Sequence, residues 1–200
     1  MALRRACRMK PENPQEPWST KIVRHVFVDE SVRRDGLYRL TAVAVPVSEL
    51  AVVSRALRSR APDGATRMHF SSESDKRRRA TLRSLSKLPI EAVSIIGPYP
   101  VRSSEEVARN LCIAALVLLS TGRVSNLTFD TRGPDRDKAD RIAIRRALVK
   151  ADEGGLMYEH RGSRDEVLLG LPDCIGWAVG AGGAWLALVR GFTQVINVSD

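Results

Sequence analysis

The sequence predicts an α/β fold, in which a mixed central sheet of about five strands carries helices on both faces. Two observations predict this class. Short apolar runs rich in β-branched residues, which suit buried strands, alternate along the chain with longer segments that have apolar residues at helical spacing. The first two strands are separated by the turn Asp35-Gly36, which favours an antiparallel hairpin at the start of the sheet.

The first half of the chain begins with an arm and continues with two strands and two helices. Residues 1–20 hold three prolines and scattered charges without periodicity, so we expect a flexible basic arm there and one α/β domain over residues 21–200. Ser48 suits the N-cap of a helix that Pro62-Asp63-Gly64 ends. After a short extended segment at 67–75, Leu82, Leu85 and Leu88 mark the second helix. The expected elements are strands 21–30 and 37–45 and helices 48–60 and 74–87.

The second half alternates strictly between strands and helices. Gly97-Pro98 closes the third strand, and Ser103-Ser-Glu-Glu106 forms a capping box for an apolar helix. Gly133-Pro134 opens a basic amphipathic helix, which Gly154-Gly155 ends. The expected elements are strands 90–97, 124–130 and 156–160 and helices 103–119, 134–150 and 171–189.

The composition is that of an ordinary globular protein with an excess of basic residues. The chain has 200 residues, of which 44% are hydrophobic and 28% charged, enough to bury a core. A formal net charge of +9, most of it from arginine, favours a polyanionic partner such as nucleic acid. A genome that prefers arginine codons would give the same excess without any contact, and both interpretations stay open.

Cysteine usage and hydropathy bear on the compartment. The three cysteines lie far apart, without a CxxC motif or a histidine cluster, which argues against a zinc finger and fits a reducing cytoplasm. The basic N-terminus has no apolar stretch of a signal peptide. Residues 167–189 are long enough to span a bilayer, but five glycines, a proline and Asp173 favour a helix that packs on the sheet. We therefore expect no stable membrane association.

Acidic residues follow the ends of two expected strands. Asp29 and Glu30 end the run Val26-Phe-Val28, and Asp130 ends the run that starts at Leu127. Ligand sites of α/β sheets gather at the carboxyl ends of strands, so these side chains can meet at one edge. Alternatively, Asp29-Glu30-Ser31 opens a polar turn.

Two further carboxylates belong to helix starts. Asp173 lies in the first turn of the last helix and is followed by Gly176 and Gly180, a small-residue face that permits close packing on the sheet. Glu73 precedes the second helix, just after His69-Phe70. We expect Cys174, beside Asp173, to be a packing residue, and His69 to be structural.

This arrangement resembles the ribonuclease H-like superfamily. Its members place an Asp at the end of the first strand, a Glu at a helix, an Asp at the end of a later strand and a carboxylate on the closing helix. More narrowly, Phe27-Val-Asp-Glu-Ser31 and Leu169-Gly-Leu-Pro-Asp-Cys-Ile175 are similar to motifs of an uncharacterised bacterial family of such domains that begins with Asp-Glu-Ser-Gly. Val32 stands where that family has Gly, and Gly170 where it has Gln.

The resemblance implies a metal-dependent nuclease or a related phosphodiester-processing enzyme. Oxygen ligands without a Cys or His set suit Mg²⁺ or Mn²⁺, and two such ions serve phosphodiester cleavage. Asp29 and Asp130 would bind both ions, and Glu73 and Asp173 would each complete one shell, with Glu30 as the alternative to Glu73. The other interpretation is a non-catalytic nucleic-acid-binding or protein-binding member of the same fold.

His160 and two groups of basic residues complete the candidate site. His160, on the last expected strand, either shuttles protons during water attack or is an exposed loop histidine. Arg132 follows Asp130, and a basic run follows Glu73, so both could bind phosphates; alternatively they form solvated helix faces. The candidate nucleic-acid-binding residues are Lys76, Arg77, Arg78, Arg79 and Arg132. The sequence leaves the oligomeric state open.

Overall fold

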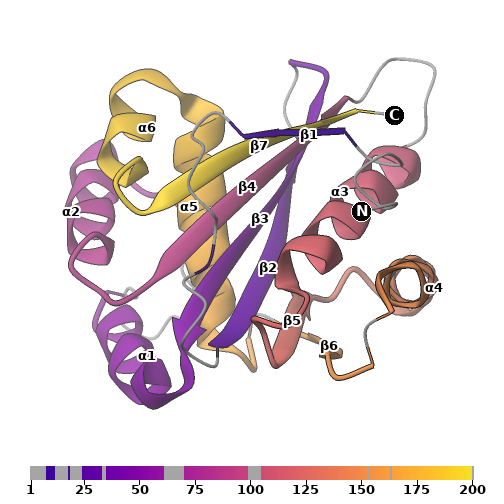
Figure 1. The fold of residues 1–200 in the computed structure, drawn as a ribbon. Helices are drawn as coiled ribbons and strands as arrows, with labels where there is room; N and C mark the ends of the chain where they lie inside the picture. The colour runs from indigo at the N-terminus through magenta and orange to yellow at the C-terminus, as the bar shows by residue number, and fades with distance from the viewer. Residues whose placement is uncertain are drawn as a thin grey trace.

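A computed structural model describes residues 8–11, 18, 24–32, 35–60, 70–98, 105–152, 154–162 and 164–199. Its centre is a seven-stranded mixed sheet with the strand order β1-β7-β4-β3-β2-β5-β6 (Figure 1). The strands are β1 Arg8–Pro11, β2 Arg24–Val32, β3 Leu37–Pro46, β4 Glu91–Pro98, β5 Asn126–Asp130, β6 Met157–Arg161 and β7 Thr193–Ser199.

Strands β2, β3 and β4 form an antiparallel meander, and parallel strands extend it on both sides. The hairpin of β2 and β3 is as expected, with Asp35 and Gly36 in its turn. On one side β5 and then β6 add to β2 in parallel, and on the other side β7 adds to β4 in parallel. β1 closes that edge by antiparallel pairing with β7.

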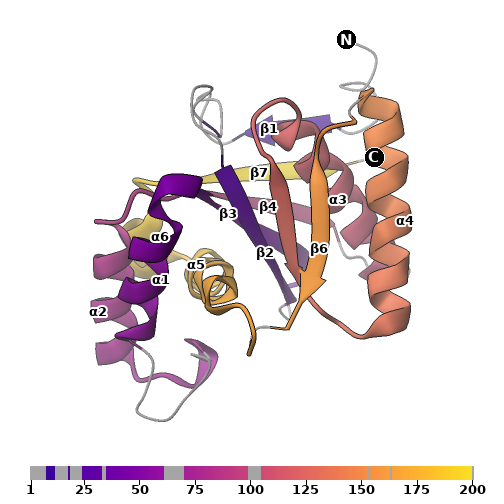
Figure 2. The ribbon, with the colours of Figure 1, turned by 90° about the horizontal axis from the view of Figure 1, so that it is seen from below.

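Helices cover both faces of the sheet, as the sequence predicted (Figure 2). One face, which we name the α5 face, carries α1 Leu50–Arg58, α2 Asp75–Leu85, α5 Gly170–Ala181 and α6 Gly183–Val189. The other, the α3 face, carries α3 Glu105–Ser120 and α4 Pro134–Ala151. Short 3-10 turns lie at η2 Val47–Glu49, η3 Phe70–Ser72 and η4 Val167–Leu169.

Each face of the sheet has its own apolar core. Side chains along β2 alternate between these two cores. Val26 and Val28 belong to the core under α3 and α4, whereas Phe27 belongs to the core under α5. Because successive side chains of a strand point to opposite faces, Asp29 points to the α5 face and Glu30 to the α3 face. The two acidic neighbours therefore belong to different sides of the sheet.

The structure corrects several boundaries. The sheet has seven strands rather than about five, because β1 and β7 were not expected. Arg8–Pro11, assigned from the sequence to the arm, forms β1, and Trp18 is buried with 1% exposure; the other residues of 1–23 lie outside the described part. β2 runs through Ser31 to Val32, so the alternative of a turn at Asp29-Glu30-Ser31 is wrong.

Two helical expectations also change in detail. The expected helix 171–189 is divided into α5 and α6 at Gly182 and Gly183, whose φ values of 68° and 51° leave the right-handed helical region. The expected extended segment 67–75 contains η3 instead; its first residues, His69 among them, and Ser103 of the capping box lie outside the described residues. Among the described helices, none has the length and apolar character needed to cross a membrane.

Candidate functional site

Asp29 and Asp130 lie side by side at one edge of the sheet. β2 and β5 run parallel with Val28 opposite Phe129, and the next residue of each strand is an aspartate. Asp130 is the last residue of β5, whereas β2 continues for three residues after Asp29. Val28 and Phe129 share the core of the α3 face, and the aspartates that follow them point to the α5 face. The strand register thus brings together the two carboxylates that the sequence singled out.

Close packing of α5 brings Asp173 to the same place. A Cβ atom on Gly176 would lie 2.9 Å from Thr41 Oγ1, so the helix backbone rests directly on β3 at this point. Thr41 is the register partner of Asp29 in the β2–β3 hairpin. Asp173 is three residues, one helical turn, before Gly176 and lies on the same side of α5.

The electrostatic state of Asp29 reflects this convergence. Burial, followed by the negative charges of Glu30, Asp173 and Asp130, raises the pKa of Asp29 to about 8. The N–H of Glu30 donates a 2.8 Å hydrogen bond to Asp29 Oδ1, which lowers the pKa but does not offset the other effects. Asp29 is thus a half-buried acid close to other acids, an arrangement that a cation would stabilise.

Glu73 reaches this edge through η3. The N–H of Phe70 donates to Asp173 Oδ2 at 3.2 Å, and the N–H of Glu73 donates to the Phe70 carbonyl at 3.3 Å. Glu73 also forms a 2.7 Å ion pair with Arg77. Burial raises the pKa of the Cys174 thiol, and the charges of Asp173 and Glu73 add to the shift, which places both carboxylates near this buried packing residue.

Glu30 belongs to a charge network on the α3 face. Arg109 of α3, with 1% exposure, donates to Glu30 Oε2 at 2.8 Å and to the Tyr38 hydroxyl at 2.6 Å. The same guanidinium forms two 2.6 Å bonds with Asp140 of α4. Arg132 pairs with Glu30 at 3.6 Å and with Asp140 at 3.3 Å. Two cations therefore hold Glu30 on the face opposite to Asp29.

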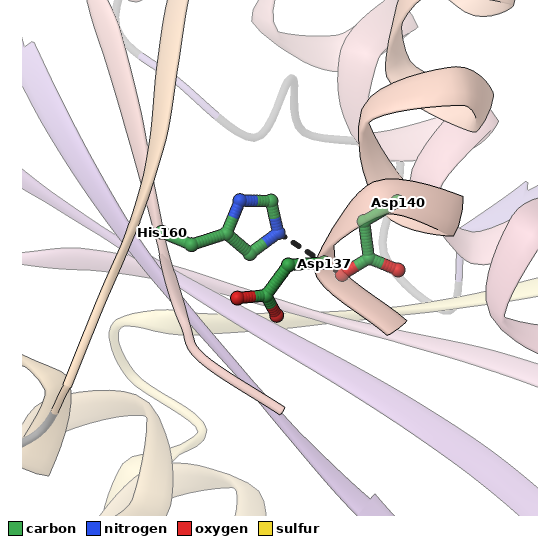
Figure 3. Close-up of side chains that lie close together, drawn as sticks. All are labelled: Asp137, Asp140 and His160. Atoms are coloured by element: carbon green, nitrogen blue, oxygen red, sulfur yellow. Dashed lines mark hydrogen bonds and ion pairs between the residues drawn. The ribbon is translucent and has the colours of Figure 1, made fainter. Parts of the chain in front are cut away.

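His160 lies in this second network and not beside Asp29. Its ring stacks on Phe129 with centroids 5.5 Å apart, and its Nε2 lies 3.2 Å from Asp140 Oδ2 (Figure 3). The side chain is 2% exposed, so the alternative of an exposed loop histidine is wrong. Burial alone would raise the pKa of Asp140, but hydrogen bonds from His160 and Arg109 outweigh it and hold the pKa well below its usual range.

Asp137, Asp140 and His160 form a compact group. Their ligand atoms all lie within 4.8 Å of one another, and among the described residues no other three His, Cys, Asp or Glu side chains come so close. Such a spacing could hold a metal ion. Asp29, Asp130 and Asp173 are spaced more widely than this.

The hydrogen bonds of this group nevertheless disfavour a metal. Asp137 accepts from the Arg132 N–H at 2.9 Å and from the Thr131 hydroxyl at 2.5 Å. Both oxygens of Asp140 already accept from Arg109, and one also from Arg132. An ion would have to displace these charged donors and would be repelled by them. The group therefore fits a structural charge network better than a metal centre.

The candidate nucleic-acid-binding residues have different surroundings. Arg78 donates to the carbonyls of Phe70 and Ser71 and lies 4.3 Å over the Trp177 ring, so it holds η3 in place. Arg79 lies 4.4 Å over the Trp185 ring. Arg132 is 10% exposed and is surrounded by carboxylates. Lys76, Arg77 and Arg79 are exposed on α2, but Arg77 is paired with Glu73, so Lys76 is the exposed cation best placed for a phosphate.

The predicted site residues thus separate by face. Asp29, Asp130, Asp173 and Glu73 converge at the carboxyl edge of β2 and β5 on the α5 face. Glu30, His160 and Arg132 belong to the network of the α3 face. The sequence analysis missed Arg109, Asp140 and Thr41; the strand alternation gave a signal for Thr41, whereas Arg109 and Asp140 meet through helix packing.

Comparisons with known proteins bear on the fold. No protein-family model matches the chain, and no curated protein matches it. A chain in the structure of the PCNA:RNase HII complex from Archaeoglobus fulgidus is similar with a TM-score of 0.50 and 14% identity, over 78% of this chain and 72% of that one. At this identity the likeness shows the fold alone, which is ribonuclease H-like, as the resemblance implied.

Two structures of Bst-RNase HIII are similar at a lower level. A mutant form of that protein gives a TM-score of 0.47 over 87% of this chain, and the complex with Mn²⁺ gives 0.43 over 86%, each with 12% identity. This chain spans 55% of the length of both.

Proposed function

We propose that this chain is a metal-dependent phosphodiester-processing enzyme, a nuclease, that acts on nucleic acid through Asp29, Asp130 and Asp173. One observation carries the proposal: adjacent parallel strands carry aspartates at matching positions on the same face, and the first turn of α5 brings a third close to them. In open α/β sheets, ligands bind at the carboxyl ends of the strands. Glu73, which η3 links to Asp173, is the fourth member that we propose.

The donors at this edge suit hard divalent cations. They are carboxylate oxygens, and burial together with neighbouring carboxylates raises the pKa of Asp29, which marks a place where positive charge is stabilising. When bound, two Mg²⁺ or Mn²⁺ ions would activate water and stabilise the leaving oxygen. Glu30 is left out of the proposed ligand set, since Arg109 and Arg132 hold it on the other face.

Nucleic acid is the substrate class that the charge of the chain favours. The net charge of +9 attracts a polyanion, and exposed Lys76 lies on α2, the helix that follows Glu73. The narrower resemblance, to the bacterial family that begins with Asp-Glu-Ser-Gly, supports the same proposal through the motifs that hold Asp29 and Asp173. The cysteines lie far apart in the sequence, which fits a reducing compartment, so we propose that the protein is cytoplasmic.

A non-catalytic member of the fold is the second candidate. It is favoured by the 2.7 Å ion pair of Glu73 with Arg77, which occupies a carboxylate that the catalytic interpretation needs. Such a protein would bind nucleic acid in a salt-sensitive way and would not require a metal.

The test is cleavage of labelled single-stranded RNA, duplex DNA and an RNA–DNA hybrid in Mn²⁺ or EDTA, with calorimetric titration of Mn²⁺ alongside. We expect metal-dependent cutting that the Asp130→Asn variant loses together with most of its Mn²⁺ affinity. Asp152→Asn is the matched control, because Asp152 is exposed at the end of α4 and asparagine tolerates its φ of 52°. Cutting that survives in Asp130→Asn, or a wild-type protein that neither binds Mn²⁺ nor cuts, would overturn the proposal.

A further inference from the structure

An apolar groove runs between α3 and α4 on the outside of the molecule. It has a volume of about 500 Å³ and is lined from both helices: Glu106, Val107, Asn110, Leu111, Ala114 and Leu118 from α3 and Ala139, Ile142, Ala143, Arg146, Ala147 and Lys150 from α4. It takes no part in the carboxylate edge, which lies on the other face of the sheet.

The groove leaves apolar side chains in water. Val107 on α3 is 47% exposed, and Ile142 on α4 is 44% exposed. Small residues form much of the floor, Ala114 on one helix and Ala139 and Ala143 on the other, so the surface is concave. A rod that carries a ridge of apolar side chains, which is the shape of an amphipathic helix, fits such a surface.

The charged residues that line the groove are Arg146 and Lys150 on α4 and Glu106 on α3. α4 carries further exposed basic residues outside the lining, whereas Asp135 is its one exposed acid. This charge repels a second copy of the same helix and attracts carboxylates. Phosphates would gain nothing from Val107 and Ile142, which distinguishes this surface from a nucleic-acid backbone site.

The two ends of the groove differ in charge, which gives it a direction. α3 and α4 both start at the carboxyl edge of the sheet, where Arg109 joins Asp140 and Arg132 joins Glu105, so the helices run in parallel. Glu106 lies at the starting end, and Arg146 and Lys150 lie at the finishing end. A helix with carboxylates in its first turn would place them on Arg146 and Lys150 and would lie antiparallel to α3 and α4.

From these features we propose that the α3–α4 groove binds an amphipathic helix of a partner protein, with acidic residues in the first turns of that helix. Apolar side chains of the helix cover Val107 and Ile142, and its acidic end contacts Arg146 and Lys150. The surface serves recruitment and is independent of the proposed nuclease site.

Two synthetic peptides of about 18 residues, long enough to span α4, test the proposal. Both carry the same apolar ridge, one with Glu in its first turns and Lys in its last turns, the other with these charges exchanged. In fluorescence anisotropy with the full chain, we expect the acid-first peptide to bind at least about fivefold more tightly at low salt.

Variants then separate the groove from the rest of the surface. Ile142→Glu should abolish binding, whereas Val52→Glu, at a valine of α1 with 48% exposure, should not. Lys150→Glu should remove the preference for the acid-first peptide. Circular dichroism of each variant confirms folding, which both exposed sites should preserve.

Several results would overturn the proposal. Equal affinity for both peptides would show that the groove does not recognise the direction of the helix. Unchanged peptide binding by Ile142→Glu would show that the peptide does not bind in the groove. Sedimentation that shows a dimer of the wild type and a monomer of Ile142→Glu would assign the groove to a second copy of the chain. If the wild type binds neither peptide, and Ile142→Glu loses binding to duplex DNA or to anionic vesicles, the groove binds nucleic acid or a membrane surface and not a helix.

Discussion

Thr41 Oγ1 on β3 lies 2.9 Å from the point where a side chain on Gly176 of α5 would begin. No larger residue fits there without movement, since real Cβ contacts are not this short. The contact holds α5 against the sheet directly over the register partner of Asp29, and it thereby sets how near Asp173 comes to Asp29.

Gly176→Ala should both destabilise the protein and weaken the proposed metal site. We expect a loss of about 1–3 kcal/mol in unfolding free energy from overpacking, measured by urea denaturation, and a fall in Mn²⁺ affinity as α5 moves outward. Gly191→Ala is the control, because a Cβ there meets nothing within 4 Å; its effect should stay within about 0.5 kcal/mol. An equal effect of the two changes would contradict the role of the contact.

The raised pKa of Asp29 predicts a stability that depends on pH. The folded state binds this proton more tightly than the unfolded state, so without metal the protein should lose stability as pH rises from about 4 to about 8, by about 1 kcal/mol per pH unit. Urea unfolding in EDTA at several pH values measures the slope. Asp29→Asn should flatten it, and Mn²⁺ should stabilise the wild type more at pH 8 than at pH 6. The idea fails if the slope is the same in both proteins.

Arg109 should be among the costliest single substitutions. Arg109→Met removes the most buried cation of the network and leaves Asp140 and Glu30 with only their longer contacts to Arg132, and we expect a loss of about 3–5 kcal/mol in chemical unfolding. Arg83→Met, on the exposed last turn of α2, should change stability by no more than about 0.5 kcal/mol. Similar losses for both would show that the network contributes little.

Two basic residues of α2 should behave differently. Lys76→Ala should weaken nucleic-acid binding and lower the salt slope of the association constant by about one, because Lys76 is exposed. Arg78→Met should instead cost about 1–3 kcal/mol of stability and reduce Mn²⁺ affinity, since Arg78 holds the carbonyls of η3, whose Phe70 donates to Asp173. Filter binding across a salt series measures the nucleic-acid affinity and its salt slope, and urea unfolding measures the stability. A change in salt slope in Arg78→Met but not in Lys76→Ala would contradict these separate roles.

Much of the carboxylate edge could be predicted from the sequence, because the apolar runs before Asp29 and Asp130 are short and typical of buried strands. The prediction that these aspartates meet at one edge is confirmed by the parallel pairing of β2 and β5, although β2 continues beyond Asp29 to Val32. The orientation of Glu30 toward the opposite face could also be predicted, because Glu30 follows Val28 by two positions and therefore shares the face of Val28. Treating Asp29 and Glu30 as one acidic pair hid this alternation.

Other features depend on information that the sequence does not carry locally. The contact of Arg109 with Asp140 requires the rotation and spacing of two helices, which only their packing on the sheet determines. β1 has only four residues, two of them charged and one a proline, which is too short a run to indicate a strand. β7, by contrast, carries Val195, Ile196 and Val198 in the core, a strand signal that the sequence analysis overlooked.

The place of β7 in the sheet has a consequence for biosynthesis. It lies between β4 and β1, so the earliest strand of the chain cannot pair until the latest one has left the ribosome. Until then β4 presents an open hydrogen-bonding edge, which is a template for wrong association between nascent chains. Completion of the sheet therefore waits for β7, and a partly made chain that lacks this strand exposes the β4 edge to wrong association.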